Sequence, residues 1–483
     1  MDMGITKQSS SERKDRILRL ADKIAPERDR WIARNEFYYS HDFAYMRFLI
    51  PEGSRILDVG CGTGALLHAL KPSHGVGIDF STKMVEVARS RHPEFTYIVG
   101  DAESAETYRD ISGPFDFIIL SDTIGSLDDC ETTLGLLNEL CDQGTRIVIS
   151  YYSKMWEPIL NLAELVGLKM PQVLQNWLST DDIANLLHLS NYEVVRCEWR
   201  QLIPKRLFGL GTLINRYIAP LAIIRRACLR NYVVARSLQH IGHRSLSTTV
   251  VIPCRNERGN IAAAIDRLPR FCEDMEILFV EGHSEDGTLE EIHRVVSAHP
   301  DIDIKVLVQE GKGKGDAVRT GFARARGEVL MILDADLTTP PEDLPKFYRA
   351  LLTGKGEFIN GSRLIYPMEQ DAMRFLNFVA NYIFSRLFSW LLNQRFTDTL
   401  CGTKVLTKRD YEKIEANRAY FGDFDPFGDF DLIFGAAKLN LKIQEIPIRY
   451  AGRSYGETQI SRFRHGLLLL RMVAFAFAKL KAF

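Results

Sequence analysis

Two segments of the sequence combine residue types that could do chemistry. Residues 55–64 read Arg-Ile-Leu-Asp-Val-Gly-Cys-Gly-Thr-Gly, an apolar strand that runs into a glycine turn. Residues 329–341 read Val-Leu-Met-Ile-Leu-Asp-Ala-Asp-Leu-Thr-Thr-Pro-Pro, an apolar strand that ends in two carboxylates. The first pattern is typical of a loop whose backbone holds a nucleotide cofactor. The second is typical of a divalent metal site that neutralises a diphosphate.

Acids near the first segment indicate which cofactor the loop would hold. The turn places glycines at Gly60, Gly62 and Gly64. Asp79 ends the next expected strand, where a carboxylate can accept both hydroxyls of a ribose. Asp58 precedes the turn and could face an amino group of the cofactor. Asp101 follows the strand expected over 96–99, where it could read an adenine edge.

This set resembles the class I S-adenosylmethionine-dependent methyltransferases over roughly residues 45–200. The resemblance implies that S-adenosylmethionine is bound by Asp58, Gly60, Gly62, Gly64, Asp79 and Asp101. Strand 115–120 is similar to the family's fourth motif, with Ser121 and Asp122 facing the reaction site. Methyl transfer depends mainly on orientation, and a base is needed only for a hydroxyl or acidic carbon acceptor. The candidate bases are Asp122, His41, Tyr38 and Tyr39.

Acids also follow three apolar strands in the second half of the sequence. Glu257 comes after strand 248–252, Asp286 follows the strand that ends at Glu281, and 329–333 leads into the two aspartates. The carboxyl ends of neighbouring parallel strands converge on one crevice, so we expect these acids to lie together. Asp334 and Asp336 offer hard oxygen ligands, which suit Mg²⁺ or Mn²⁺.

These motifs resemble family-2 glycosyltransferases of GT-A fold, specifically the dolichyl- or polyprenyl-phosphate mannosyltransferase and glucosyltransferase group, over about residues 247–465. The likeness extends to 311–315, 361–363, 398–402 and 453–459. It implies a GDP- or UDP-sugar donor whose nucleoside is lined by Pro253, Asn256, Glu257, Glu281 and Asp286. It further implies a metal on Asp334 and Asp336, phosphates on Arg363 and Arg453, and a substrate-binding role for Asp398. The family usually has two adjacent aspartates where this chain has Glu281-Gly282, which leaves the donor base open.

The acceptor could be a hydroxyl or a phosphate. Asp429, within Phe427–Asp431, could act as a base for a sugar hydroxyl. A polyprenyl phosphate is already an anion and needs no base. Residues 374–396 are rich in aromatics and repeat a polar residue every fourth position, from Asn377 to Asn393. This pattern predicts either a buried helix of the glycosyltransferase core or a helix in the membrane interface, where a lipid acceptor is available. The apolar and basic segment 463–483 could also lie on lipid.

Composition excludes several classes of protein. The net charge of -1 provides no field to collect nucleic acid. The eight cysteines contain no Cys-x-x-Cys pair, which argues against zinc ribbons and fits a reducing cytosol. The first thirty residues have no apolar core of a secretory signal, and no window reaches the roughly 18 apolar residues of a membrane span. We therefore expect a cytoplasmic protein that contacts the membrane peripherally, on its cytoplasmic face.

The elements that position these residues predict an α/β fold with two domains. With 483 residues, the chain exceeds one ordinary core. Strands and helices alternate from 55 to 150 and again from 247, which predicts parallel sheets with helices on both faces. The two resemblances imply a seven-stranded Rossmann-like methyltransferase domain followed by a GT-A domain with peripheral amphipathic helices. We expect domains over 1–236 and 247–483, joined by a linker at 237–246. Residues 200–236 carry many arginines and no acid, and predict a helical extension that either packs on the first domain or rests on anionic lipid.

The sequence thus predicts a bifunctional enzyme. Fusion of the two domains suggests that sugar transfer and methyl transfer serve one glycoconjugate pathway. Two alternatives stay open. One is a single-activity glycosyltransferase for a soluble hydroxyl acceptor, with a non-catalytic methyltransferase-like domain. The other is a nucleotide-binding regulatory module.

Overall fold

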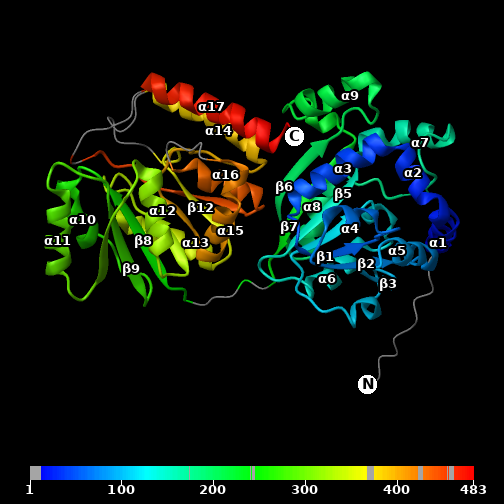
Figure 1. Cartoon of the computed structure of the whole chain (residues 1–483), viewed down its shortest axis with the longest axis horizontal. Coiled ribbons are helices and arrows are strands. Elements are labelled where there is room, and N and C mark those ends of the chain that lie inside the picture. Colours follow the sequence, from blue (N-terminus) through cyan, green and yellow to red (C-terminus); the bar gives the residue numbers. More distant parts are fainter. Residues whose placement is uncertain are drawn as a thin grey trace. The chain divides into compact units, whose positions relative to one another are not determined.

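The computed structural model describes residues 12–172, 175–239, 241, 245–366, 375–422, 428–453, 455 and 462–482. It divides the chain into two compact units, unit 1 (Met1–His240) and unit 2 (Ile241–Phe483). In each unit, helices flank the strands of one seven-stranded sheet (Figure 1). The two mostly parallel seven-stranded sheets with their flanking helices confirm the predicted α/β fold class.

The sheet of unit 1 has the strand order β3-β2-β1-β4-β5-β7-β6. Its strands are β1 Arg55–Val59, β2 His74–Asp79, β3 Thr96–Val99, β4 Phe117–Ser121, β5 Arg146–Tyr152, β6 Tyr192–Arg200 and β7 Arg230–Ser237. Its helices are α1 Glu12–Ile24, α2 Arg28–Arg34, α3 Glu36–Leu49, α4 Ala65–Leu70, α5 Thr82–Arg91, α6 Cys130–Asn138, α7 Glu157–Leu165, α8 Thr180–Leu189 and α9 Leu210–Leu213. Strands β1 to β5 pair in parallel, and β7 is antiparallel to both β5 and β6.

Strand β7 corrects the expectation of helices throughout 200–236. Residues 230–237 form a fully buried strand between β5 and β6. Its run Val233-Val234-Ala235 pairs with the apolar middle of β5, and its flanking arginines are buried because acids on other elements neutralise them. Because Arg230 and Arg236 stand at its two ends, the segment looks like a continuation of the basic helical stretch when the sequence is read alone.

The sheet of unit 2 has the order β10-β9-β8-β11-β13-β12-β14, with β13 antiparallel to β11 and β12. Its strands are β8 Thr248–Cys254, β9 Met275–Glu281, β10 Asp303–Val308, β11 Val329–Ile332, β12 Phe358–Ser362, β13 Lys404–Thr407 and β14 Ile443–Pro447. Its helices are α10 Ile261–Asp266, α11 Thr288–Ala298, α12 Lys314–Arg324, α13 Leu344–Leu352, α14 Phe375–Leu392, α15 Lys408–Ala416, α16 Phe430–Lys438 and α17 Arg462–Leu480.

Chain order reverses once in each parallel region, between β1 and β4 in unit 1 and between β8 and β11 in unit 2. Helices after the two strands leave in opposite directions at such a point, so a crevice opens beyond the carboxyl ends of the strands. Buried aliphatic residues of the central strands form the core that holds each crevice in place, for example Ile118 in unit 1 and Met331 in unit 2.

Helix α14 realises the predicted helix over 374–396 and lies alongside α17 (Figure 1), with the rings of Trp390 and Phe477 stacked at 5.7 Å. Its polar stripe faces inward: Asn381 and Ser385 are buried, and Ser389 bonds the backbone of the loop that follows. Arg374 and the side chain of Asn377 lie outside the described residues. No helix among the described residues is long and apolar enough to span a bilayer.

Candidate functional sites

The glycine turn after β1 has the backbone that only glycine adopts readily. Gly60, Gly62 and Gly64 have φ values of 81°, 55° and 78°. A Cβ on Gly60 would lie 2.2 Å from Thr123 Oγ1, and one on Gly62 would lie 2.8 Å from Arg28 Nε. The turn is therefore packed against two side chains that approach its backbone, as a nucleotide loop requires.

Asp79 is fixed to this turn from the end of β2. Its carboxylate accepts hydrogen bonds from the backbone N–H groups of Gly62 and Ser81, both at 2.9 Å. Burial raises its pKa, and these two hydrogen bonds oppose that rise. The arrangement fixes the position of the carboxylate at the mouth of the β1 turn and leaves it facing a cavity.

That cavity has a volume of about 430 Å³ and lies at the carboxyl ends of β1 and β4. Three of the six residues predicted to bind the cofactor line it, namely Gly60, Asp79 and Asp101. Asp58, Gly62 and Gly64 lie outside its lining and support it from behind. The structure therefore brings the predicted donor residues to one place but exposes only half of them to a ligand.

Asp58 is a buried carboxyl behind the turn. It is 2% exposed, and burial together with the nearby Asp79 raises its pKa to about 7. Arg28, whose guanidinium approaches Gly62, favours the ionised form but does not offset the burial. The carboxyl of Asp58 therefore changes charge near neutral pH. It lies behind the residues that line the cavity.

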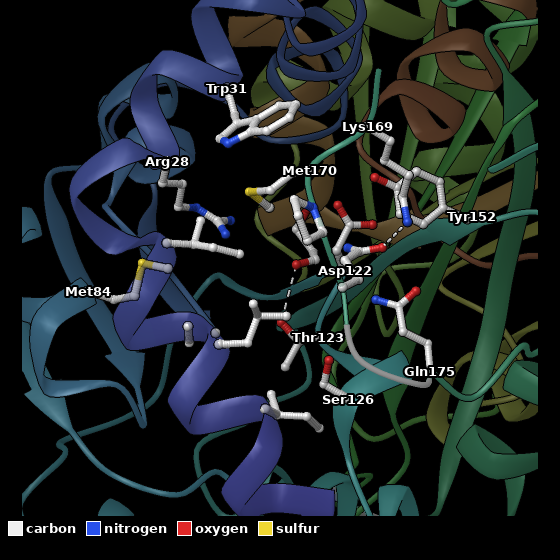
Figure 2. Close-up of a pocket in the computed structure, with 18 of the residues that line it drawn as sticks. Arg28, Trp31, Met84, Asp122, Thr123, Ser126, Tyr152, Lys169, Met170 and Gln175 are labelled. Atoms are coloured by element: carbon white, nitrogen blue, oxygen red, sulfur yellow. Dashed lines mark hydrogen bonds between the residues drawn. The ribbon is translucent and has the colours of Figure 1, made fainter. Parts of the chain in front are cut away.

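We call the half of the cavity at Asp79 the donor half and the half at Asp122 the acceptor half. The acceptor half contains most of the candidate bases. Figure 2 shows Asp122, Tyr152 and Lys169 opposite Arg28 and Trp31. Ser121, Tyr38 and Tyr39 also line the cavity, whereas His41 does not.

Asp122 is held in place by Arg230 from β7. Asp122 has a left-handed backbone (φ 59°), and its carboxylate accepts a hydrogen bond from Arg230 Nη1. The guanidinium also donates to Asp42 Oδ1 at 3.2 Å and to Ser150 Oγ at 3.0 Å. Burial raises the pKa of Asp122, although Arg230 opposes it. Arg230 is the residue that sequence reasoning missed, because it stands in a segment interpreted as helix.

Three charged side chains fasten helix α1 over the donor half of the cavity. Lys14 Nζ donates to Asp101 at 2.5 Å and also pairs with Glu103. Asp22 accepts from Ser81 Oγ at 2.5 Å, and Arg13 donates to the backbone oxygens of Gly125 and Leu127. Asp101 thus has a lysine partner rather than a free carboxylate for an adenine edge. No motif in the sequence indicated that this helix covers the site.

In unit 2, the two predicted metal ligands follow β11 and are both paired with cations. Asp334 Oδ1 lies 2.6 Å from Lys314 Nζ. Asp336 Oδ2 accepts from Arg453 Nη2 at 2.7 Å, and its Oδ1 caps the turn at Thr338. Arg453 also bonds Glu257 Oε1 at 3.1 Å, so one arginine joins the ends of β8 and β11.

Opposite charges alternate from Asp334 into the protein. Lys314 lies 4.0 Å from Asp429, and Asp429 accepts from the fully buried Lys404 at 3.0 Å. Burial would raise the pKa of Asp334, but Lys314 and Lys404 outweigh it and lower this pKa. The pKa of Lys314 is raised by Asp334 and Asp429 against the effect of burial. Lys314 belongs to segment 311–315, which resembles the family. No feature of the sequence indicated that Lys404 belongs to the site.

The residues predicted to line the nucleoside lie at the ends of β8 and β9. Asn256 has a φ of 57° and its Oδ1 accepts from Glu285 N at 2.9 Å. Glu281 is buried and accepts from the N–H groups of His283 and Ser284 at 3.0 and 2.6 Å. Asp286 accepts from Tyr455 OH at 3.2 Å. Pro253 precedes this cluster on β8 and is half-buried.

Arg363 and Asp398 form a closed pair. Arg363 donates from Nε and Nη2 to the two oxygens of Asp398 at 2.6 and 2.8 Å. Asp398 is fully buried, and Arg363 lowers its pKa against the effect of burial. In this structure both oxygens of Asp398 are taken up by Arg363, and its expected role in substrate binding stays a prediction. The side chain of Arg363 retains a small exposed fraction through which it could meet a phosphate.

The Asp334–Asp336 pair fits a divalent cation by its donor set. Both side chains offer oxygen ligands at the end of one strand, and Gly402 keeps the space beside Asp334 clear, since a Cβ there would lie 1.9 Å from Oδ2. In the described part of the chain, three possible metal ligands lie within 4.8 Å of one another only at His68, His92 and Glu94, on the surface of unit 1. A cation on the aspartate pair therefore needs ligands from a bound substrate.

Comparison with known proteins assigns both units. Residues 30–196 match the family model described as methyltransferase domain. Residues 249–414 match the model described as glycosyl transferase family 2. The chain therefore joins two transferase domains. More specifically, it joins a methyltransferase domain to a domain of glycosyl transferase family 2.

Similar proteins include a dolichol-phosphate mannosyltransferase of Saccharomyces cerevisiae, 34% identical over 22% of this chain and 42% of that protein. A dolichyl-phosphate beta-glucosyltransferase of Drosophila melanogaster is 28% identical over 43% of this chain and 67% of that protein. A solved methyltransferase structure from Thermotoga maritima covers 46% of this chain and 99% of its own, with 19% identity and a TM-score of 0.35. The chain spans about half or less of the length of the first curated relatives that it matches.

Proposed function

We propose that unit 2 transfers a sugar from a GDP- or UDP-sugar to a polyprenyl phosphate, and that unit 1 transfers a methyl group from S-adenosylmethionine within the same glycoconjugate pathway. The observation that carries the first half is the row of charges Lys404, Asp429, Lys314 and Asp334 at the carboxyl end of β11. The similarity to the yeast dolichol-phosphate mannosyltransferase and the fly dolichyl-phosphate beta-glucosyltransferase supports a polyprenyl-type acceptor.

The charges at this edge suit a diphosphate leaving group. Lys314 and Arg453 hold Asp334 and Asp336 and lie where phosphate oxygens would approach them. Asp334 and Asp336 would hold Mg²⁺ or Mn²⁺, which would stabilise the negative charge on the departing diphosphate. The two cationic side chains orient the phosphates, and Lys314 lowers the pKa of Asp334. The acceptor oxygen forms a bond to the anomeric carbon as the bond to the diphosphate oxygen breaks, so the anomeric centre inverts.

The position of Asp429 favours a phosphate acceptor over a hydroxyl. The residue is 5% exposed and accepts from Lys404 at 3.0 Å, with Lys314 at 4.0 Å. Buried between two ammonium groups, this carboxylate has little surface left to contact the hydroxyl of an acceptor. A phosphate anion needs no base. We therefore assign Asp429 the role of positioning Lys314.

A second feature of unit 2 supports a lipid acceptor. The outer faces of α14 and α17 expose Tyr382, Ile383, Leu467 and Leu470. Arg386 and Arg471 are exposed on the same two helices. An apolar face with basic residues is suited to the surface of an anionic membrane, where a polyprenyl phosphate resides. We infer a peripheral position on the cytoplasmic face of the membrane.

The donor half of the unit 1 cavity supports the methyl transfer. Its acids have lost water and their pKa values are raised, so a ligand that brings positive charge and hydroxyl donors would stabilise them. S-adenosylmethionine brings a sulfonium, an amino group and two ribose hydroxyls. Asp79 faces the cavity with its carboxylate fixed, and is the residue placed to accept the ribose.

Two measurements on the full chain test these assignments separately. Calorimetry with S-adenosylmethionine, and with GDP-mannose or UDP-glucose plus Mn²⁺, should show one site of each kind. Incubation with the same sugar nucleotide, Mn²⁺ and polyprenyl phosphate, followed by mass spectrometry of the lipid fraction, should show a hexose adduct of the lipid. If S-adenosylmethionine does not bind, unit 1 is a scaffold. If only a soluble hydroxyl acceptor is glycosylated, the polyprenyl assignment is wrong.

A further inference from the structure

Helix α7 of unit 1 presents an apolar stripe to solvent. Met155, Ile159, Leu162 and Val166 follow one another at spacings of four, three and four residues, so they lie on one face. Each is more than half exposed, and the adjacent Leu165 is 85% exposed. Glu164 does not interrupt the stripe, because its carboxylate is turned to Lys169 and to the backbone of Gln172.

A second segment of unit 1, residues 207–223, exposes a similar set. Phe208 is completely exposed and has a φ of 56°, a backbone conformation that is unfavourable for a bulky residue. Ile223 is 95% exposed. Other large apolar residues of this segment that are more than 40% exposed are Leu207, Leu210, Leu213, Tyr217, Ile218 and Leu221. Single exposed apolar residues are ordinary, but a set of this size marks an interaction surface.

Both segments border the acceptor half of the cavity. Leu160 and Ala163 of α7, on a neighbouring face of the helix to the stripe, line the cavity. Pro204 and Leu229, which precede and follow the second segment in the chain, also line the cavity. Leu168 lines the cavity and is also 48% exposed, so it stands at the edge between the two environments. The segments are joined by the hydrogen bond from Trp156 Nε1 to Ala227 O at 2.8 Å.

The second segment carries only positive charge, whereas the α7 side of the surface carries Glu157 and Glu164. No Asp or Glu occurs between Trp199 and Asn256. Lys205, Arg206, Arg216 and Arg226 are exposed in the same stretch. Apolar side chains with a basic surround complement an anionic bilayer, where lysine and arginine each add attraction and the apolar groups enter the interface. A protein partner or a second copy would need acidic groups to complement this surface.

We propose that the docking surface, defined as the exposed side chains of residues 155–168 and 206–226, lies in the interface of an anionic bilayer. The methyl acceptor is then an amphipathic membrane lipid that enters the cavity past Leu168. This inference rests on the proposed methyl transfer and names the class of its acceptor. It also places the acceptors of both units in one membrane.

Flotation of the full chain with phosphatidylcholine vesicles containing phosphatidylglycerol tests the docking. Arg206→Gln with Arg216→Gln should weaken vesicle binding about 25-fold, or about five-fold per arginine. Leu162→Ser with Leu165→Ser should weaken it about ten-fold or more. Leu189→Ser, at an exposed leucine outside the docking surface, is the matched control and should bind as the unchanged chain does. Equal binding of all four proteins would overturn the proposal.

A fluorescent label reports which residues enter lipid. Seven of the eight cysteines are buried and Cys197 is half-buried, so a Cys197→Ser background allows labelling of a single introduced thiol. An environment-sensitive probe on Leu165→Cys, Phe208→Cys or Leu168→Cys should brighten and shift to the blue on vesicles. The same probe on Leu189→Cys should not. A response at Leu189→Cys equal to the others would show non-specific adsorption and contradict the proposal.

The acceptor class is tested by following the methyl group. With methyl-labelled S-adenosylmethionine, a sugar nucleotide and vesicles containing polyprenyl phosphate, label should enter the organic phase. Recovery of the label only in water-soluble product would overturn the lipid acceptor. Calorimetry with S-adenosylmethionine on the same preparation separates the two failures. If the donor binds and the vesicle experiments fail, the docking is wrong; if the donor does not bind, the proposed methyl transfer is wrong.

Discussion

Burial raises the pKa of Asp58, Asp79 and Asp122 in unit 1, whereas in unit 2 Lys314 and Arg363 outweigh burial and lower the pKa of Asp334 and Asp398. The two sheets have the same layered design and a crevice at the same topological position. The difference lies in the partners of the acids. Unit 1 leaves its carboxyls short of positive charge, so it favours a cationic ligand. Unit 2 gives its carboxylates cations, so it is prepared for phosphates.

The largest expected effect comes from removing a charge in unit 2. Asp334→Asn should lower the turnover of sugar transfer about 1000-fold, because the carboxylate supports both the cation site and Lys314. Steady-state kinetics at saturating Mn²⁺ measures this. Asp301→Asn, at an exposed acid of the same unit, is the control and should be unchanged. Loss of S-adenosylmethionine binding in the Asp334 variant would show that the units are not independent.

The corresponding change in unit 1 should affect binding. Asp79→Asn removes a charged acceptor that is fixed by two backbone N–H groups, and should raise the dissociation constant for S-adenosylmethionine about 100-fold. Calorimetry measures this constant, and sugar transfer should stay as it was. Asp110→Asn, at an exposed acid of unit 1, is the matched control. An unchanged constant for Asp79→Asn would remove this carboxylate from the donor site.

Asp58 makes the stability of unit 1 depend on pH. Its pKa rises from 3.8 to about 7 on folding, so the native state binds its proton more tightly. The free energy of unfolding should therefore fall as pH rises from about 4 to about 7 and then level off. Between pH 5 and 7 this one group contributes about 2–3 kcal/mol of that fall.

Asp58→Asn should flatten the fall, as measured by urea unfolding followed by tryptophan fluorescence. Four of the five tryptophans, at 31, 156, 177 and 199, belong to unit 1, so the signal reports mainly that unit. Asp110→Asn should keep the original slope. A variant at position 58 with the slope of the unchanged chain would show that the buried carboxyl is not the group that titrates.

The smallest effect on turnover is expected for Asp429→Asn. If Asp429 positions Lys314, turnover should fall less than about ten-fold, since a general base contributes about 100- to 10,000-fold. The variant should unfold more easily because Lys404 loses its charged partner. Kinetics corrected for the folded fraction measures the first effect, and a thermal melt the second. A loss of 100-fold or more with a normal melt would restore the hydroxyl acceptor and a base at this position.

Much of the fold and the outline of both sites could be predicted from local patterns in the sequence. The apolar runs before Gly60 and before Asp334 identified two central strands, because strand, turn and acid are adjacent in the sequence. The strand at Arg230 was misread because this arginine is neutralised by Asp42 and Asp122, more than one hundred residues away. Such pairing is decided by tertiary packing, and no local window contains it.

The same reason explains the site residues that were missed. Lys404 meets Asp429 across 25 positions, and Lys14 meets Asp101 across 87. Each residue taken alone resembles an ordinary surface lysine. Asp398 was assigned to the substrate by the resemblance of 398–402 to the family, and only the folded chain shows that the acid is buried against Arg363.

Helix α1 has no buried residue, and polar attachments through Arg13, Lys14 and Asp22 hold it across the donor half of the cavity. Such attachments weaken as ionic strength rises, whereas the apolar core beneath them does not. We therefore expect helix α1 to leave this position more often as the ionic strength rises. The rate at which a bound cofactor exchanges in unit 1 should rise with the salt concentration. The rate of ligand exchange in unit 2 should show no matching rise.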